Sequence, residues 1–267
     1  MLDVLAAGVD LDARVATDPL RFPRRYREAA DVEVAAAFAA ALAFGRVALF
    51  GAVVEACLAE ADAHGGPAAY ADLLAADPAR PAFAGRYYRW LTTPDLRALF
   101  AAFGGVRAAL GGLAGAFPPS PEPGATLAMG IATLRGHLGP DASPALRSCF
   151  PAPDGGSACK RWCMFLRWMV RRAEPDLGLW THLDPACLVI PLDTHVFRVA
   201  GFLGLRRGTV AGWRTALEVT AALRAYDAQD PLRYDFALAH LGIARACLGR
   251  RDPAVCPTCP LDTACRA

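Results

Sequence analysis

Few stretches of this 267-residue chain alternate apolar with polar residues, and this feature constrains its fold more than any other. A strand with one buried face needs such alternation. Apolar residues nevertheless make up 55% of the chain, Ala is a large share of them, and the β-branched residue Ile occurs only three times. Because Ala is the strongest helix former, the sequence predicts an all-α protein. The length allows one large domain or two small ones.

Capping residues and apolar stripes place the expected helices. We expect a helix at 31–44 capped by Asp31, one from 47 to about 64, and one opened by Thr93 as its cap. Further helices are expected at 125–137, 160–172, 209–225 and 231–247, the last capped by Asp230. Residues 138–158 are expected to form a long connection. Cys57 and His64 are interpreted as a core thiol and a loop histidine.

The sequence also bears on the cellular compartment. An acidic residue, Asp3, stands where a secretory signal has basic ones. The longest run without charge, residues 108–121, is too short and too interrupted by Gly and Pro to span a bilayer. We therefore expect a soluble cytoplasmic protein without membrane contact, in which the nine cysteines are metal ligands, catalytic groups or buried thiols rather than disulfides.

Four of these cysteines stand close together at the carboxy-terminal end with the spacing C-x8-C-x2-C-x5-C. They are Cys247, Cys256, Cys259 and Cys265. Zinc sites usually take their ligands as two close pairs on separate hairpins. One close pair with two single cysteines in one loop is better suited to a [4Fe–4S] cluster, which takes four thiolates. We expect a [4Fe–4S] cluster, with zinc as the second candidate and unligated thiols as the third.

Lys160 is the only lysine among 28 basic residues. A solvated cation in this chain is otherwise always Arg, so a retained Lys indicates chemistry that Arg cannot do. A Lys amine can lose its proton and attack an electrophilic carbon, whereas Arg stays protonated. Taken alone, Lys160 is equally well interpreted as a surface charge. It follows a glycine-rich stretch and opens an apolar helix, with Cys159 and Cys163 interpreted as packing residues.

Basic residues are concentrated around Lys160. The segment 155–214 carries a net charge of about +5, while the whole chain carries only +2. A local basic stretch suits a polyanion such as the DNA backbone. On charge alone, a solvated helix face remains the stronger interpretation. A later segment, Leu192-Asp193-Thr194-His195-Val196-Phe197-Arg198-Val199, supplies a carboxylate, Asp193, that would also serve as a helix N-cap.

The lysine that opens a helix, the segment around Asp193 and the terminal cysteines together resemble the helix-hairpin-helix DNA glycosylase superfamily, over roughly residues 155–265. The Asp193 segment is similar to the aspartate segment of endonuclease III, and His240-Leu241-Gly242 through Cys265 is similar to its cluster loop. Two features differ from endonuclease III. Asp154-Gly155-Gly156-Ser157-Ala158-Cys159 replaces the usual Leu-Pro-Gly-Val-Gly hairpin, and Lys160 and Asp193 are 33 positions apart, a long separation similar to that of the archaeal 8-oxoguanine glycosylase branch.

The resemblance implies two helical lobes with an intervening cleft, one formed by 46–175 and the other by 1–45 and 176–267. It implies base-excision repair: Lys160 attacks the sugar, Asp193 stabilises the cationic transition state, and a lysine–sugar imine permits strand cleavage. By the same resemblance His195 is structural, and the cluster serves folding and DNA docking.

We therefore expect a monomeric DNA glycosylase with AP-lyase activity that acts on damaged double-stranded DNA. An 8-oxoguanine-type purine is the preferred lesion because of the long Lys–Asp separation, oxidised pyrimidines come second, and RNA stays open as a substrate. The alternative from another class is a non-catalytic iron–sulfur nucleic-acid-binding protein of the same fold. A zinc-stabilised scaffold is a weaker third hypothesis.

Overall fold

The computed structural model describes residues 1–243 and 247–267, and these form helices joined by loops. Within these ranges no strand is present, only isolated bridges at Tyr88–Leu91 and Ser157–Gly212, so the predicted all-α class is confirmed. The α-helices are α1 (Leu2–Ala7), α2 (Leu11–Val15), α3 (Ala29–Leu42), α4 (Val47–Asp62), α5 (Pro67–Ala76), α6 (Thr93–Leu110), α7 (Ala125–Gly136), α8 (Pro144–Arg147), α9 (Lys160–Val170), α10 (Thr194–Phe202), α11 (Trp213–Arg224) and α12 (Asp235–Ile243). Short 3-10 helices lie at Pro19–Arg21, Pro23–Arg25, Leu113–Ala116, Pro153–Gly155, Pro185–Cys187, Cys256–Thr258 and Asp262–Ala264.

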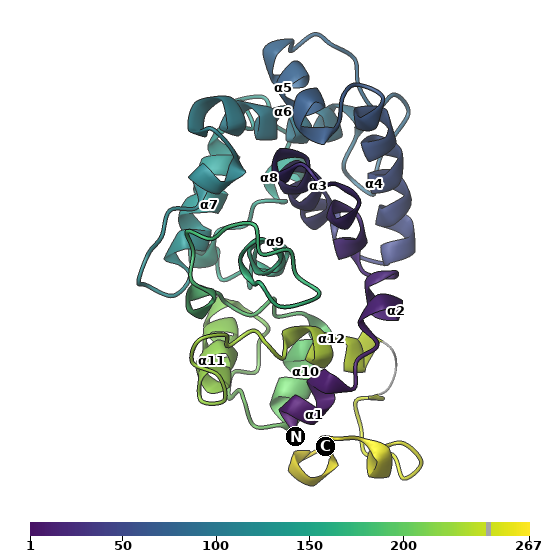
Figure 1. Ribbon diagram of the computed structural model, residues 1–267, viewed down its shortest axis with the longest axis vertical. Coiled ribbons are helices and arrows are strands. Elements are labelled where there is room, and N and C mark those ends of the chain that lie inside the picture. The colour runs from purple at the N-terminus through teal and green to yellow at the C-terminus, as the bar shows by residue number, and fades with distance from the viewer. Residues whose placement is uncertain (244–246) are drawn as a thin grey trace.

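Helix α3 is the central element of the core. Every residue from Val32 to Leu42 is buried, and the helix packs against α4, α5, α6 and α9 (Figure 1). Its small Ala side chains allow neighbours on all sides, as expected for a helix that is apolar all round. The predicted cap was wrong: Glu28 holds the N-cap position, and Asp31 instead accepts a hydrogen bond from the backbone N–H of Ala68 at 2.8 Å.

Helices α4, α5 and α6 pack together beside α3. The apolar stripe of α4, formed by Phe50, Val54, Cys57 and Leu58, is buried. Helix α5 was not predicted, because Gly66-Pro67 was interpreted only as the end of α4. It crosses α6 at close range, since a Cβ on Gly104 would lie 2.1 Å from the Ala71 carbonyl oxygen. The cap of α6 is Thr92 rather than Thr93, and it forms a capping box with Asp95.

Helix α9 runs through the middle of the molecule (Figure 1). It begins at Lys160, as predicted, and buries every residue from Trp162 to Val170. Two arginines, Arg167 and Arg171, are buried with the apolar side chains at the end of this helix. Their ion pairs join α9 to the chain around Asp176, Asp230 and Asp235.

Helices α10, α11 and α12 form the other end of the molecule, where both termini lie (Figure 1). Helix α12 packs on α10 and on α1. It begins at Asp235 rather than at 231, because Asp230 pairs with Arg171 instead of capping a helix. The predicted extension of this helix to Cys247 crosses residues 244–246, which lie outside the described residues.

The contacts of α3 bear on the expected division into two lobes. Helix α3 packs with α4, α5 and α9, and these contacts favour a lobe boundary before α3 rather than at residue 45. The division itself stays a prediction. Among the described helices, none is both long enough and apolar enough to cross a membrane.

Candidate active site

Lys160 is fixed in place by the backbone on either side of it. Cys159, in the N-cap position of α9, has a φ of +48°, and its thiol donates to the Pro151 carbonyl oxygen at 3.2 Å. The indole of Trp162 donates to the Cys149 carbonyl oxygen at 2.8 Å. These contacts anchor the loop before α9 to its first turn, so the lysine side chain starts from a rigid base.

The glycine-rich segment before Lys160 is also ordered by backbone contacts. Gly156 has a φ of +79°, and its carbonyl oxygen accepts a hydrogen bond from the Trp213 N–H at 3.2 Å. Ser157 forms a bridge with Gly212. The start of α11 therefore supports the turn that leads into Lys160. This support comes from a segment more than 50 residues further along the chain, which the local sequence did not indicate.

Asp193 caps α10, as predicted. Its Oδ1 accepts hydrogen bonds from the backbone N–H groups of His195 and Val196, each at 2.8 Å. The other carboxylate oxygen, Oδ2, lies 3.9 Å from Lys160 Nζ. The cap therefore holds the carboxylate in one orientation and directs its second oxygen to the lysine.

Lys160 and Asp193 line one open cleft of about 880 Å³. Its walls also include the turn around Asp18, the segment after α3, the loop before α9 and one face of α12. The Lys160 side chain is 37% exposed and that of Asp193 is 14% exposed. The lysine is thus a partly solvated member of an ion pair rather than an amine enclosed by apolar side chains.

A buried layer of charge lies beneath this pair, and the sequence reasoning missed it. Arg167, two turns after Lys160 on α9, donates to Asp176 at 3.1 Å and to Asp235, and both Arg167 and Asp235 line the cleft. Burial, with a smaller contribution from the charge of Asp193 and against the opposing effect of Arg167, raises the pKa of Asp235 to about 6. The signal that could have revealed this layer is a charged residue inside an apolar helix.

Two histidines lie near the cleft in different settings. His195 packs against α12 where Gly242 leaves room: a Cβ there would lie 2.5 Å from His195 Nδ1. This close packing is consistent with a structural role. His240 is 4% exposed, its Nε2 is 3.5 Å from Asp18 Oδ2, and its ring packs on Phe236 at 4.2 Å between centroids. His240 also lines the cleft, so α12 contributes polar groups to the site.

The basic segment 155–214 is less available to a polyanion than its charge implied. Arg167 and Arg171 are neutralised by buried carboxylates. Arg161 donates to the carbonyl oxygens of Ala41 and Ser148, and Arg206 donates to those of Phe197 and Gly208. Much of this charge therefore holds the fold together, and neither a polyanion nor solvent is the partner of these four arginines.

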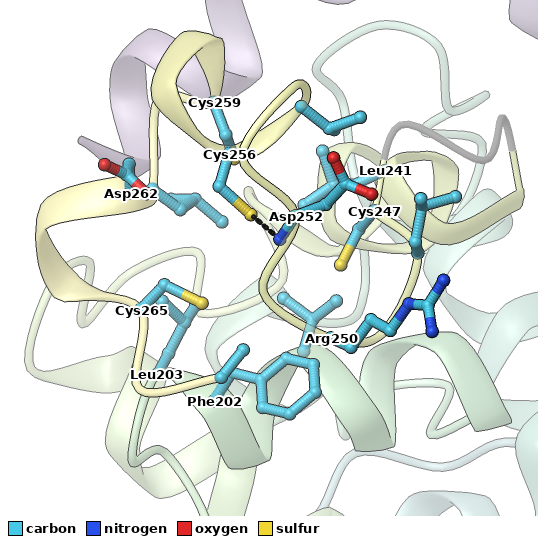
Figure 2. A pocket seen from close by; sticks show the side chains of 15 residues that line it. Phe202, Leu203, Leu241, Cys247, Arg250, Asp252, Cys256, Cys259, Asp262 and Cys265 are labelled. Carbon is cyan, nitrogen blue, oxygen red and sulfur yellow. Dashed lines mark hydrogen bonds between the residues drawn. The ribbon is translucent and has the colours of Figure 1, made fainter.

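The four terminal cysteines line a single small cavity of about 30 Å³ between the loop and α10 (Figure 2). The remaining wall is largely apolar, with Phe202, Leu203 and Leu261 among its residues. The N–H of Asp252 donates to Cys256 Sγ at 3.2 Å. In the described part of the chain, no three His, Cys, Asp or Glu side chains form a ready metal-binding group. The fold thus gathers the four thiols around one space without bringing them into a ligand set.

Four of the five cysteines outside this loop are buried packing residues, as predicted for three of them, and Cys187 is partly buried. Cys57, Cys159 and Cys163 are buried, and burial raises the pKa of the Cys57 and Cys159 thiols to about 12 and about 11. Thiols so reluctant to ionise are poor nucleophiles and poor metal ligands. His64 is an exposed loop residue, also as predicted.

Comparison with known families matches residues 18–244 to a family model described as "Protein of unknown function (DUF2400)". The chain belongs to the DUF2400 family. The matched region contains Lys160, Asp193 and every cleft-lining residue except Thr17, and it ends before Cys247, so the four terminal cysteines lie beyond it. No curated protein and no solved structure matches the chain.

Proposed function

We propose that this DUF2400 protein is a DNA glycosylase with AP-lyase activity that removes an oxidised base, with an 8-oxoguanine-type purine as the preferred lesion. The observation that carries the proposal is the placement of Lys160 Nζ 3.9 Å from Asp193 Oδ2 in an open cleft. The two residues come from segments 33 positions apart. Their convergence supports the resemblance on which the proposal rests, including the two-lobed, helix-hairpin-helix glycosylase-like fold.

The proposed reaction divides one task between the two side chains. Lys160 first loses its proton to solvent in the open cleft, and the neutral amine attacks the sugar C1′ while the bond to the base breaks; the base leaves with the electron pair and takes up a proton from solvent, and Asp193 stays ionised. The charge of Asp193 stabilises the cationic sugar in the transition state. Opening of the sugar ring gives an imine with Lys160, from which the 3′ phosphate leaves by β-elimination. The cap on α10 keeps the carboxylate in place throughout.

The size of the cleft supports an extrahelical substrate. Enzymes that act on a base in duplex DNA rotate the nucleotide out of the stack into a pocket. A volume of about 880 Å³ falls within the range of pockets that enclose small molecules. Double-stranded DNA carrying the lesion is the proposed partner, and the protein is proposed to act as a monomer.

For the terminal loop we propose a [4Fe–4S] cluster held by Cys247, Cys256, Cys259 and Cys265, with zinc as the alternative. Their shared cavity with an apolar wall and the N–H···S bond from Asp252 to Cys256 suit a thiolate-bound cluster, because hydrogen bonds to sulfur tune such centres. When bound, the cluster would supply structural support for the loop and its docking to DNA. The proposed reaction does not pass through it.

Borohydride trapping tests the proposal directly. The purified protein is incubated with a panel of duplexes that each carry one lesion, and borohydride reduces any imine to a stable covalent link. We expect protein–DNA adducts on duplexes containing 8-oxoguanine and none on an undamaged duplex. A protein that binds these duplexes but forms no adduct with any of them would favour the non-catalytic alternative.

A further inference from the structure

A tight turn next to the cleft displays two large side chains to solvent. Tyr88 and Leu91 exchange both of their backbone hydrogen bonds, each at 2.8 Å, so Arg89 and Trp90 are the central residues of the turn. Arg89 has a φ of +53°, a left-handed conformation that residues with a Cβ adopt at an energetic cost. Glycine would relieve this strain. Strained positions occur preferentially where function requires a particular side chain.

The indole of Trp90 is held in a fixed orientation although much of it remains accessible. It stacks on Phe44 with ring centroids 5.1 Å apart and an interplanar angle of 19°. The guanidinium of Arg89 lies within 6 Å of three ring centroids, those of Phe44, Tyr88 and Trp90. Trp90 is nevertheless 53% exposed, and its neighbour Tyr87 is 70% exposed. A preorganised aromatic surface of this kind binds a flat ligand with little loss of side-chain entropy.

This surface is continuous with the wall of the cleft. Phe44, on which the indole of Trp90 stacks, also lines the cleft. The guanidinium of Arg161 lies 5.1 Å from the Phe44 ring centroid, and Arg161 follows Lys160 directly on α9. A chain of stacked groups therefore runs from the exposed Trp90 through Phe44 to the first turn of the helix that carries the proposed nucleophile.

The two segments that form this surface carry only positive charges. Segments 41–54 and 81–94 contain Arg46, Arg86 and Arg89 and no acidic residue. Arg86 pairs with Glu60 at 2.9 Å, whereas Arg46 and Arg89 are exposed. Stacking aromatics together with exposed arginines fit a nucleic-acid strand, because the rings stack on bases and the cations neutralise phosphates. An acidic peptide would use the arginines but would not require an exposed, preoriented indole.

We propose that Phe44 and the turn Tyr87–Leu91 form a stacking platform for an unpaired base of the DNA strand that enters the cleft. The proposal rests on the proposed function for its choice of partner, and adds a binding site outside the Lys160–Asp193 pair. The unpaired base stacks on Trp90, and Arg89 and Arg46 contact the phosphate backbone of the DNA. Phe44 connects this surface to the wall of the cleft.

The test measures preference for an unpaired base. Dissociation constants of the full-length protein are measured by fluorescence anisotropy, at one fixed salt concentration, for a duplex with a single bulged nucleotide and for its fully paired counterpart. We expect the wild type to favour the bulged duplex, Trp90→Ala to lose about tenfold in affinity for that duplex only, and Trp90→Phe to retain most of it. Tyr226→Ala is the matched control, since Tyr226 is also an exposed aromatic residue, 60% exposed, and lies just after the end of α11.

The outcomes separate the platform from the proposed chemistry. An unchanged preference in Trp90→Ala, or no preference in the wild type, overturns the platform even if borohydride trapping succeeds. A preference that Trp90→Ala abolishes establishes the platform even if no lesion is trapped, in which case the proposed catalysis fails alone. Thermal unfolding of each variant checks that the substitution at this exposed position has left the fold intact.

Discussion

At the scale of single residues, Lys160 is the position on which the proposed chemistry depends. Lys160→Arg keeps a positive charge at this position, where Lys160 Nζ lies 3.9 Å from Asp193 Oδ2, but removes the amine that can lose its proton. We expect strand cleavage and borohydride trapping to vanish and base release to fall by several orders of magnitude. Affinity for lesion-containing DNA should change little, because phosphate contacts come from many arginines. Cleavage at a near wild-type rate would make Lys160 a bystander.

Asp193 permits its structural and chemical roles to be separated, because one oxygen caps α10 and the other faces Lys160. Asp193→Asn keeps an acceptor for both N–H groups, so the free energy of unfolding should change by less than about 1 kcal/mol. Asp193→Asn should nevertheless slow base release by about 100-fold or more, because it removes the charge that stabilises the transition state. Asp193→Ala should add a loss of about 1 kcal/mol in stability. If Asp193→Asn and Asp193→Ala lost the same stability and the same activity as each other, this would contradict a catalytic role of Asp193.

At the scale of elements, the buried arginines of α9 determine how this helix is held. Arg167 pairs with both Asp176 and Asp235, so Arg167→Met leaves the buried Asp235 without its partner and Asp176 with Arg171 alone. We expect a loss of about 3 to 5 kcal/mol in the free energy of unfolding, measured by urea denaturation. Arg172→Met is the matched control on the exposed side and should stay within about 0.5 kcal/mol of wild type. Similar losses of stability in Arg167→Met and Arg172→Met would show that the loss of a charge, and not the burial of Arg167, causes the effect.

The same layer predicts a pH dependence. The pKa of Asp235 is raised by burial from 3.8 to about 6, so the folded state binds this proton more tightly than the unfolded state. Its contribution to stability is therefore fully present below pH 3.8 and is lost as the pH rises through about 6. Asp235→Asn cannot titrate. The stability of wild type minus that of the variant should fall by up to about 3 kcal/mol over this window, and a constant difference would refute the raised pKa.

At the scale of the whole molecule, the carboxy-terminal loop contacts both the end of α10 and the first residue of the chain. Arg266 N–H donates to the Phe202 carbonyl oxygen at 2.9 Å, and the hydroxyl of Thr263 contacts the Met1 sulfur at 3.0 Å. The loop lies beyond the region that matches the family model, so the proposed cluster has to be tested by measurement on this chain itself.

Metal analysis of the purified protein is the corresponding measurement. We expect a brown protein with about four iron atoms per chain, and Cys259→Ser should lose the iron together with the local order of the loop. Cys187→Ser is the control, because Cys187 lies outside the loop and should leave the iron content unchanged. A colourless protein with stoichiometric zinc would contradict the cluster.

The sequence by itself determined the helical class, the start of α9 at Lys160 and the cap at Asp193, because helix propensity and capping act over a few neighbouring residues. It also singled out the lysine, through composition alone. Only the tertiary structure decided that Lys160 and Asp193 share a cleft, that Arg167 serves a buried carboxylate layer instead of a polyanion, and that Trp90 continues the cleft wall through Phe44. These relations join positions from nine to more than 60 residues apart, and they depend on helix packing, which no local pattern specifies.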